Sequence, residues 1–150
     1  AIDNIKALET KLNKTEQILF LADNAGEVFF DLPLVKKLAD FAPVTYVVKQ
    51  SPVQNDITLA DLERSGLKKD LPRVITTGTD TPGVDMAMAS PEFKAAFEAA
   101  DLVIAKGMGY WETLSELLAQ SKVFYLLKAK CQLVADYLNV TLNSYLALLL

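Results

Sequence analysis

The sequence predicts an α/β fold, specifically a three-layer, Rossmann-like, doubly wound domain built on a mostly parallel sheet. Two observations support this prediction. Short, almost wholly apolar segments alternate with segments in which apolar residues recur every three or four positions, a pattern typical of buried strands separated by amphipathic helices. The apolar segments also lack the polar alternation of half-exposed antiparallel strands, so we expect helices on both faces of the sheet.

The first elements are a helix, a strand and a second helix. Apolar spacing predicts a helix within residues 1–16, ahead of the α/β core. Residues 18–22 are a short apolar run and form the first predicted strand. Residues 28–39 show helical spacing, but Pro33 lacks a backbone donor and its ring clashes one turn back. We therefore expect the second helix either to bend or to begin later, near Asp31.

The remaining elements alternate in the same way. Apolar and β-branched runs predict strands at residues 44–49, 73–77, 102–105, 122–127 and 145–150, and helical spacing predicts helices at residues 58–65, 90–100, 111–119 and 132–138. Ser90 is a favourable N-cap with Pro91 at the first helical position, and Gly66 is a favourable helix terminator. No repeat or linker divides the chain, so we expect residues 1–150 to form one domain.

The composition excludes several kinds of chemistry. The 150 residues contain no His and one Cys, which excludes an imidazole base, His-bound zinc and an internal disulfide. The net charge of −4 argues against a nucleic-acid partner, and no apolar run is long enough for a membrane helix. We expect no secretion signal, no membrane partner and a cytoplasmic location. Catalysis must then depend on carboxylates, amides, hydroxyls, lysines, backbone N–H groups or a hard metal ion.

Polar residues gather where the predicted strands end, and the carboxyl ends of parallel strands form the edge at which ligands bind. Asp23 and Asn24 follow the first strand, and Asn55 and Asp56 follow the second. Carboxylate and amide oxygens are the ligands that Mg²⁺ and Mn²⁺ prefer. Each pair alone is more typical of a turn or an N-cap, and only the two pairs together favour a metal site.

A glycine-rich segment follows the fourth predicted strand. Lys106, Gly107, Met108 and Gly109 would present backbone N–H groups and one ammonium group to an anion at the start of a helix. The segment is not the dinucleotide-binding fingerprint, because Glu112 occupies the position of its third glycine. The alternative is a tight turn with a solvated lysine.

Two further groups of residues have simpler interpretations. Cys131 follows the fifth strand and is either a nucleophilic thiolate or a small packing residue, and packing is favoured. The bulky aromatic side chains are most simply core or subunit contacts: Trp111, Phe29, Phe30 and Phe124.

Four segments together resemble the DUF89 family, the metal-dependent damage-control phosphatases that are also described as ARMT-like. The segments are residues 21–27, 49–56, 105–114 and 127–131, and they occur in the order and at the spacing of the family. The sequence is most similar to the stand-alone prokaryotic type. The resemblance implies a Rossmann-like α/β fold, in agreement with the layout above. It also implies a helical domain before the α/β core, of which only one helix is expected here.

The resemblance assigns roles to particular residues. Asp23, Asn24 and Asp56 correspond to the protein ligands of a divalent metal, which is Mn²⁺, Mg²⁺, Co²⁺ or Ni²⁺ in the family. Lys106 corresponds to the lysine that contacts the substrate phosphate, and these four are the predicted catalytic residues. The family hydrolyses phosphate monoesters of small metabolites, including sugar phosphates, so a small phosphorylated metabolite is the expected partner. The predicted substrate-binding residues are Lys106, Gly107, Met108, Gly109, Glu27 and Asn55.

Several details stay open at this level. Glu27 or Asp80 is the candidate for proton transfer, and a covalent role for Asp23 is less favoured than metal-assisted hydrolysis. Tyr110 stands where many members of the family carry Asn. Two other functions are retained as alternatives, an S-adenosylmethionine-dependent carboxyl methyltransferase and a non-catalytic module that binds metal or phosphate.

Overall fold

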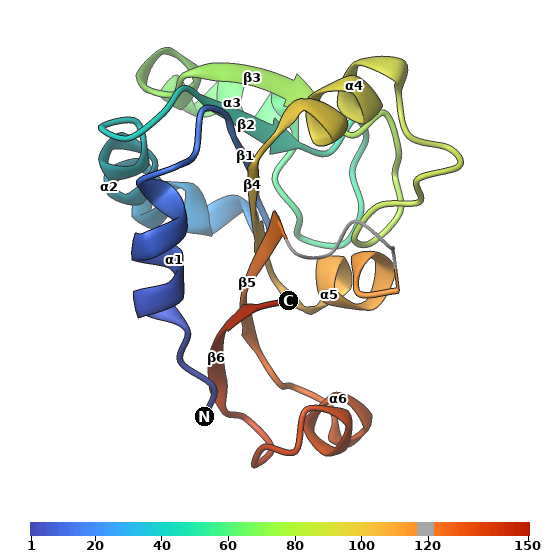
Figure 1. Cartoon of the computed structure of the whole chain (residues 1–150). Helices are drawn as coiled ribbons and strands as arrows, with labels where there is room; N and C mark the ends of the chain where they lie inside the picture. The colour runs from blue at the N-terminus through green and yellow to red at the C-terminus, as the bar shows by residue number, and fades with distance from the viewer. Residues whose placement is uncertain (117–121) are drawn as a thin grey trace.

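A six-stranded sheet in the order β3-β2-β1-β4-β5-β6 forms the centre of the molecule (Figure 1). The structure, a computed structural model, describes residues 1–116 and 122–150. β1 to β5 run parallel, and β6 pairs antiparallel with β5. The strands are β1 Ile18–Leu21, β2 Val44–Val48, β3 Arg73–Thr76, β4 Leu102–Lys106, β5 Val123–Lys128 and β6 Tyr145–Leu149. The prediction of a doubly wound, mostly parallel sheet is confirmed.

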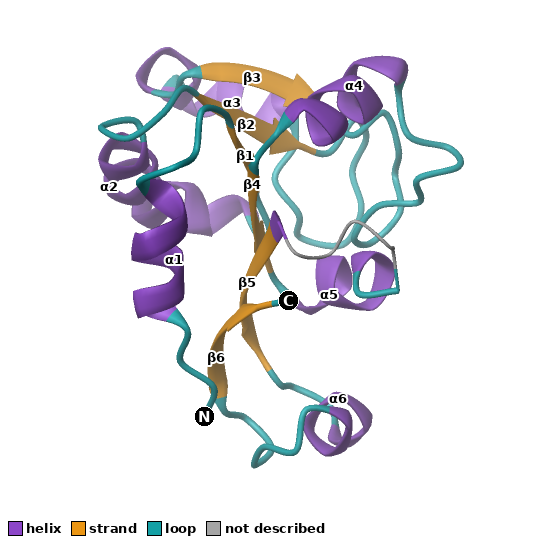
Figure 2. Cartoon of the chain, viewed as in Figure 1, coloured by secondary structure: helices purple, strands orange, loops and turns teal. Residues whose placement is uncertain are grey.

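Helices cover both faces of this sheet and so complete three layers (Figure 2). The α-helices are α1 Ile5–Leu12, α2 Val28–Leu38, α3 Leu59–Ser65, α4 Pro91–Ala99, α5 Met108–Leu114 and α6 Gln132–Tyr137, and the 3₁₀ helices are η1 Ala25–Glu27 and η2 Leu67–Asp70. On one face, α2 and α3 bury Val35 and Leu62 against the strands. On the other face, α4, α5 and α6 bury Phe93, Trp111 and Val134. Both faces of the inner strands β1, β2 and β4 are therefore withdrawn from water, which explains their continuous apolar sequences.

The helix termini follow the predicted capping chemistry. The Ser90 hydroxyl accepts a hydrogen bond from the Phe93 N–H at 3.1 Å, and Pro91 is the first residue of α4. Gly66 ends α3 with a φ of 71°, a conformation that glycine adopts without the steric cost of a Cβ atom. These local signals fix where the helices begin and end.

Of the two expectations for the second helix, the later start near Asp31 is wrong: α2 begins at Val28, because η1 already brings the chain into helical backbone and the helix continues through Pro33. The predicted start of the helix after β4 is also wrong. α5 begins at Met108 rather than at residue 111, because Gly107 with a φ of 88° is the N-cap. Residues 117–119 of the predicted helix lie outside the described residues.

The aromatic residues fall into two groups. Phe124 and Trp111 are buried in the core, as expected. Phe29 and Phe30, at the start of α2, are 63% and 79% exposed and so do not belong to the core. Among the described residues, no helix has both the length and the apolar character needed to cross a membrane.

Candidate active site

The first and fourth strand ends meet at the point where the strand order reverses. β1 lies between β2 and β4, so the chain turns to opposite sides of the sheet after β1 and after β3. In open α/β sheets this switch point is where ligands bind, outside the carboxyl ends of the strands. Asp23 follows β1 here, and Gly107 follows β4.

Asp23 and Gly107 are in direct contact. A Cβ atom built on Gly107 would collide with the carboxylate of Asp23, and the positive φ of Gly107 independently disfavours other residues. The N–H of Gly107 donates to the Leu126 carbonyl at 2.9 Å, so this N–H is already used within the sheet. Glycine at position 107 thus lets the end of β4 lie against the Asp23 carboxylate.

The loop after β2 folds back over the loop after β1. The Ala25 N–H donates to the Asn55 carbonyl at 2.8 Å, and the Ile57 N–H donates to the Asp23 carbonyl at 2.8 Å. An isolated antiparallel bridge joins Asn24 to Asp56. The two acidic pairs singled out in the sequence therefore lie side by side.

Neither member of the second pair is a helix cap. Thr58 is the N-cap of α3, because its hydroxyl accepts from the Asp61 N–H while the Asp61 carboxylate accepts from the Thr58 N–H. This capping box satisfies the helix terminus. The Asp56 side chain is therefore free to face the site.

The ionised forms of Asp23 and Asp56 are disfavoured by burial and by the neighbouring negative charges. Burial raises the pKa of Asp23 to about 6, and the nearby charges of Glu27 and Asp56 add to this effect. Burial also raises the pKa of Asp56, although Lys49 opposes that change. The Asn24 Nδ2 group donates to Asp23 Oδ2 at 3.0 Å and to Glu27 Oε1 at 2.6 Å, which partly compensates the negative charge.

Three oxygen-bearing side chains fit a hard divalent cation. Asp23 and Asp56 offer carboxylates and Asn24 offers an amide oxygen, a donor set typical of Mg²⁺ and Mn²⁺. Within residues 1–116 and 122–150, no cluster of three or more His, Cys, Asp or Glu side chains has a metal-binding arrangement. A cation would therefore depend on the Asn24 amide as the third ligand.

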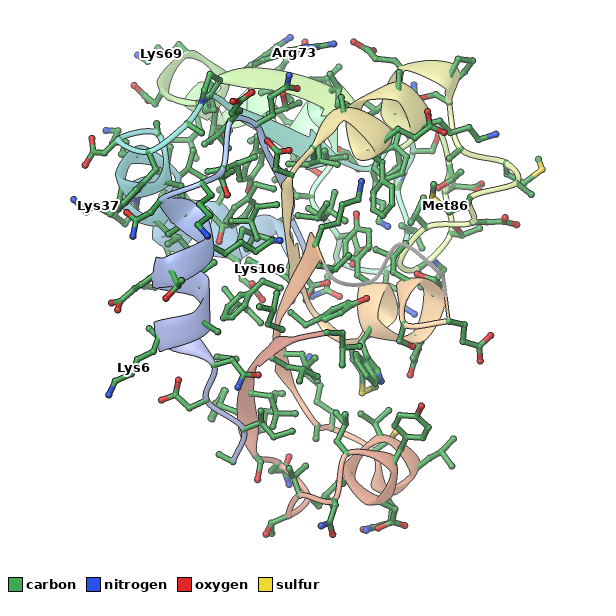
Figure 3. The ribbon with its side chains drawn as sticks, viewed as in Figure 1. Lys6, Lys37, Lys69, Arg73, Met86 and Lys106 are labelled. Atoms are coloured by element: carbon green, nitrogen blue, oxygen red, sulfur yellow. The ribbon has the colours of Figure 1, made fainter. Side chains whose placement is uncertain are left out.

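Lys106 lies at the end of β4 in a cluster of two carboxylates. Its ammonium group donates to Glu27 Oε2 and, at 2.6 Å, to Asp31 Oδ1. Figure 3 shows Lys106 near the centre of the molecule, whereas the side chains of Lys6 and Lys37 point outward at its edge. Burial opposes the charged form of Lys106, but the two carboxylates hold its pKa above the ordinary value. Lys106 is thus a charged, partly buried donor beside the acidic loops.

A second lysine, Lys49, was not among the predicted site residues. Its side chain is completely buried, donates to the Gly83 carbonyl, lies 3.6 Å from Asp56 Oδ2 and sits 4.6 Å from the centre of the Tyr110 ring. Burial lowers the pKa of Lys49, and Asp56 opposes that change. Lys49 therefore places a buried positive charge next to the Asp56 carboxylate.

Another missed residue is Asp31, which binds both Lys106 and Tyr46. A sequence signal for it exists, because Asp31 follows Glu27 by four residues and this spacing places both carboxylates on one helix face. The signal was hidden because Pro33 suggested that the helix begins later.

The loop after β3 packs against the first turn of α5 instead of carrying an acid to the site. A Cβ atom on Gly109 would lie 2.9 Å from the Gly83 nitrogen, and the Val84 N–H donates to the Thr113 hydroxyl at 3.1 Å. Asp80 is exposed and does not line the cleft beside Asp23. Of the two candidates for proton transfer, the structure brings only Glu27 to the acidic loops.

A cleft of about 640 Å³ opens beside Asp23. Glu27, Lys106, Gly107 and Met108 line it among the predicted substrate-binding residues, whereas Gly109 and Asn55 do not. Lys128 and Lys130 from the end of β5 and the loop after it line the same cleft. The positive charge of Lys130 lowers the pKa of Asp23 and so partly offsets burial.

Two other residues near the site have structural positions. Tyr110 is completely buried, and its hydroxyl has no hydrogen-bond partner among the described residues. Cys131 is half-buried at the N-cap of α6 and packs against the apolar cluster on that face of the sheet. This position agrees with the packing interpretation of Cys131.

Fold and site together define a doubly wound α/β protein with an oxygen-rich site at its switch point. The chain belongs to the family of damage-control phosphatase ARMT1-like domains, whose model matches residues 1–146. The resemblance to the DUF89 family is thereby confirmed.

Similar proteins come from three archaea. A damage-control phosphatase of Pyrococcus horikoshii is 46% identical over 141 residues, which cover 93% of this chain and 48% of that protein. An uncharacterized protein of Methanocaldococcus jannaschii is 38% identical over 148 residues, with coverage of 95% and 48%. A damage-control phosphatase of Archaeoglobus fulgidus is 34% identical over 146 residues, with coverage of 91% and 50%.

A solved structure has the same fold. The crystal structure of a DUF89 family protein from Pyrococcus horikoshii superposes with a TM-score of 0.91 and 43% identity, and the match covers 99% of this chain and 52% of that chain. The chain spans about half the length of the relatives that it matches.

Proposed function

We propose that this site hydrolyses phosphate monoesters of small metabolites, sugar phosphates among them, with a divalent cation. The observation that supports the proposal is the meeting of Asp23, Asn24 and Asp56 at the switch point, with Lys106 beside them. An oxygen donor set and a neighbouring ammonium are the parts that phosphoryl transfer requires. Two relatives that share 46% and 34% identity with the chain are named damage-control phosphatases, in agreement with this proposal.

Asp23, Asn24 and Asp56 would hold the cation, which is Mn²⁺, Mg²⁺, Co²⁺ or Ni²⁺. When bound, such a cation polarises a phosphoryl oxygen and lowers the pKa of a coordinated water. Burial, with the neighbouring carboxylates, disfavours the charged form of Asp23, so a bound cation would stabilise that form.

The other residues of the cleft act on the substrate directly. Lys106 binds the phosphoryl group and neutralises charge that develops on its oxygens. Burial raises the pKa of Glu27, but hydrogen bonds from Lys106 and Asn24 outweigh burial and lower this pKa below its ordinary value. The Glu27 carboxylate is therefore ionised at neutral pH and can accept a proton from the attacking water. Gly107 and Met108 form the wall against which the substrate lies.

The size of the cleft and the acidity of the chain favour a small phosphorylated metabolite over a nucleic acid or a membrane surface. About 640 Å³ accommodates a metabolite of this class, and a net charge of −4 repels polyanions. We place the protein in the cytoplasm, where phosphorylated metabolites occur.

The test is release of phosphate from an aryl phosphate ester with and without Mn²⁺. We expect metal-dependent release by the parent protein and its loss in Asp23→Ala. Asp80→Ala is the matched control, because it removes an exposed carboxylate outside the cleft and should retain parental activity. Absence of metal-dependent release by the parent refutes the proposal. Binding of S-adenosylmethionine without such release would favour a carboxyl methyltransferase, and metal binding alone would favour a non-catalytic module.

A further inference from the structure

Lys106 is held by two carboxylates that differ in accessibility. Glu27 at the end of η1 and Asp31 in the first turn of α2 both accept from its ammonium group. The Asp31 side chain is 3% exposed and the Glu27 side chain is 36% exposed. One partner of Lys106 is therefore sealed in the protein, and the other borders the cleft.

The sealed carboxylate is fixed from behind by the sheet. The Tyr46 hydroxyl of β2 donates to Asp31 Oδ2 at 2.7 Å. The Tyr46 ring stacks on Phe20 of β1 with ring centres 5.3 Å apart, and both rings are completely buried. A continuous chain of hydrogen bonds thus runs from the packed core through Tyr46 and Asp31 to Lys106.

The charges of this cluster are not balanced for an incoming phosphate. One ammonium faces two carboxylates, so this hydrogen-bonded cluster itself carries an excess negative charge, although Lys128 and Lys130 line the same cleft. An ammonium has three N–H donors, and two of them are already used. A phosphoryl oxygen next to Lys106 would therefore meet repulsion from the more accessible carboxylate, Glu27.

We propose that Asp31, fixed by Tyr46, is the positioning residue that holds the Lys106 ammonium at the cleft, and that Glu27 is the exchangeable partner, which releases Lys106 to the phosphoryl group and is then available to accept the proton of the attacking water. The inference rests on the proposed function, since it takes the anion to be the phosphate of the substrate or product. It assigns opposite effects to two carboxylates that bind the same ammonium.

The test measures binding of inorganic phosphate by calorimetry at saturating Mg²⁺, together with KM and kcat for an aryl phosphate ester. In Asp31→Asn, loss of a charge-assisted hydrogen bond should weaken phosphate binding and raise KM by about tenfold. In Glu27→Gln, removal of the repelling charge should leave phosphate binding equal to that of the parent or tighter.

Tyr46→Phe keeps the test valid if Asp31→Asn does not fold. This variant retains the stacked ring and the Asp31 carboxylate and removes only the hydroxyl, so we expect a folded protein with a lower melting temperature in which phosphate binding is weakened by about threefold. Tyr125→Phe is the matched control, because the Tyr125 hydroxyl is also buried but has no hydrogen-bond partner among the described residues. Tyr125→Phe should bind phosphate as the parent does.

The possible results separate the two proposals. Parental phosphate affinity and KM in both Asp31→Asn and Tyr46→Phe would overturn the inference, as would tighter binding in Asp31→Asn or lost binding in Glu27→Gln. A fall in kcat alone, with KM unchanged, would indicate a smaller active fraction and also contradict a positioning role. A parent that binds phosphate but hydrolyses no ester would refute the proposed function and leave the inference standing, and a parent that binds no phosphate would refute the inference.

Discussion

Replacement of Gly107 by Ala tests whether the end of β4 must lie against the Asp23 carboxylate. Two effects act at this position. With φ 88° and ψ 163°, Gly107 lies in a backbone region that is essentially restricted to glycine, and an L-residue there costs roughly 1–3 kcal/mol. The new Cβ would also collide with the Asp23 carboxylate, so that side chain must move away from the position it shares with Asn24 and Asp56.

The expected result has two separable parts. For a chain of this length, backbone strain alone should lower the melting temperature by roughly 2–12 °C. At a free Mn²⁺ concentration of about 100 times its Kd, the parent protein should gain about 2.7 kcal/mol of stability. Gly107→Ala should lose most of this metal-dependent gain, because the displaced Asp23 no longer serves as a ligand.

Two other glycines supply the controls for this measurement. Gly66 has a φ of 71° with nothing within 4 Å of an added Cβ, so Gly66→Ala should carry the strain but keep the response to Mn²⁺. Gly26 lies in the first loop with open space around it and without a positive φ, so Gly26→Ala should match the parent in both respects. The assay is thermal unfolding with and without Mn²⁺. A full metal-dependent gain in Gly107→Ala would refute the reasoning.

Three further predictions concern charge and capping. Burial raises the pKa of Asp23 to about 6, so in the absence of metal the folded protein favours the protonated carboxyl. The resulting stabilisation is complete below pH 3.8 and is lost as the pH rises through about 6. Asp23→Asn should remove this pH dependence of the melting temperature and abolish stabilisation by Mn²⁺. Lys49→Met leaves Asp56 and a carbonyl unpaired in the interior and should cost about 3 kcal/mol in denaturant titrations, whereas Lys37→Met breaks an exposed pair and should cost at most about 1 kcal/mol. Ser90→Ala should lower stability by about 1 kcal/mol in the same titrations, and an unchanged midpoint would contradict the capping role.

The fold is predictable because burial on both faces of a parallel sheet marks the inner strands β1, β2 and β4 as apolar runs. The predicted segments around Phe20, Val47 and Ile104 coincide with β1, β2 and β4 to within a residue or two. The antiparallel direction of β6 is not predictable in this way, because an apolar segment has the same pattern in either direction. Of the two expectations for α2, only the later start near Asp31 is wrong, because the steric effect of Pro33 does not take account of the 3₁₀ turn that precedes it.

The sequence predicts only those site residues that follow the carboxyl ends of the strands. This criterion, with the resemblance, selects Asp23, Asn24, Asp56 and Lys106, and the structure brings the three acidic-loop residues together with Lys106 alongside. Residues whose role depends on partners from other elements escape it. Asp31 is fixed by the hydroxyl of Tyr46 on β2, a contact that no local sequence spacing encodes.

The central position of β1 and β4 in the sheet has a consequence for the order of assembly during folding. Ile18 pairs with Leu102, so the innermost strand pair closes a long loop and is an entropically expensive contact. Asp23 and Asn24 can meet Asp56 once β1 and β2 have paired, but Lys106 and Gly107 join them only after β4 docks. Recovery of phosphate binding during refolding is therefore expected to lag behind the formation of the β1–β2 pair. The time course of that recovery would report when β4 pairs with β1.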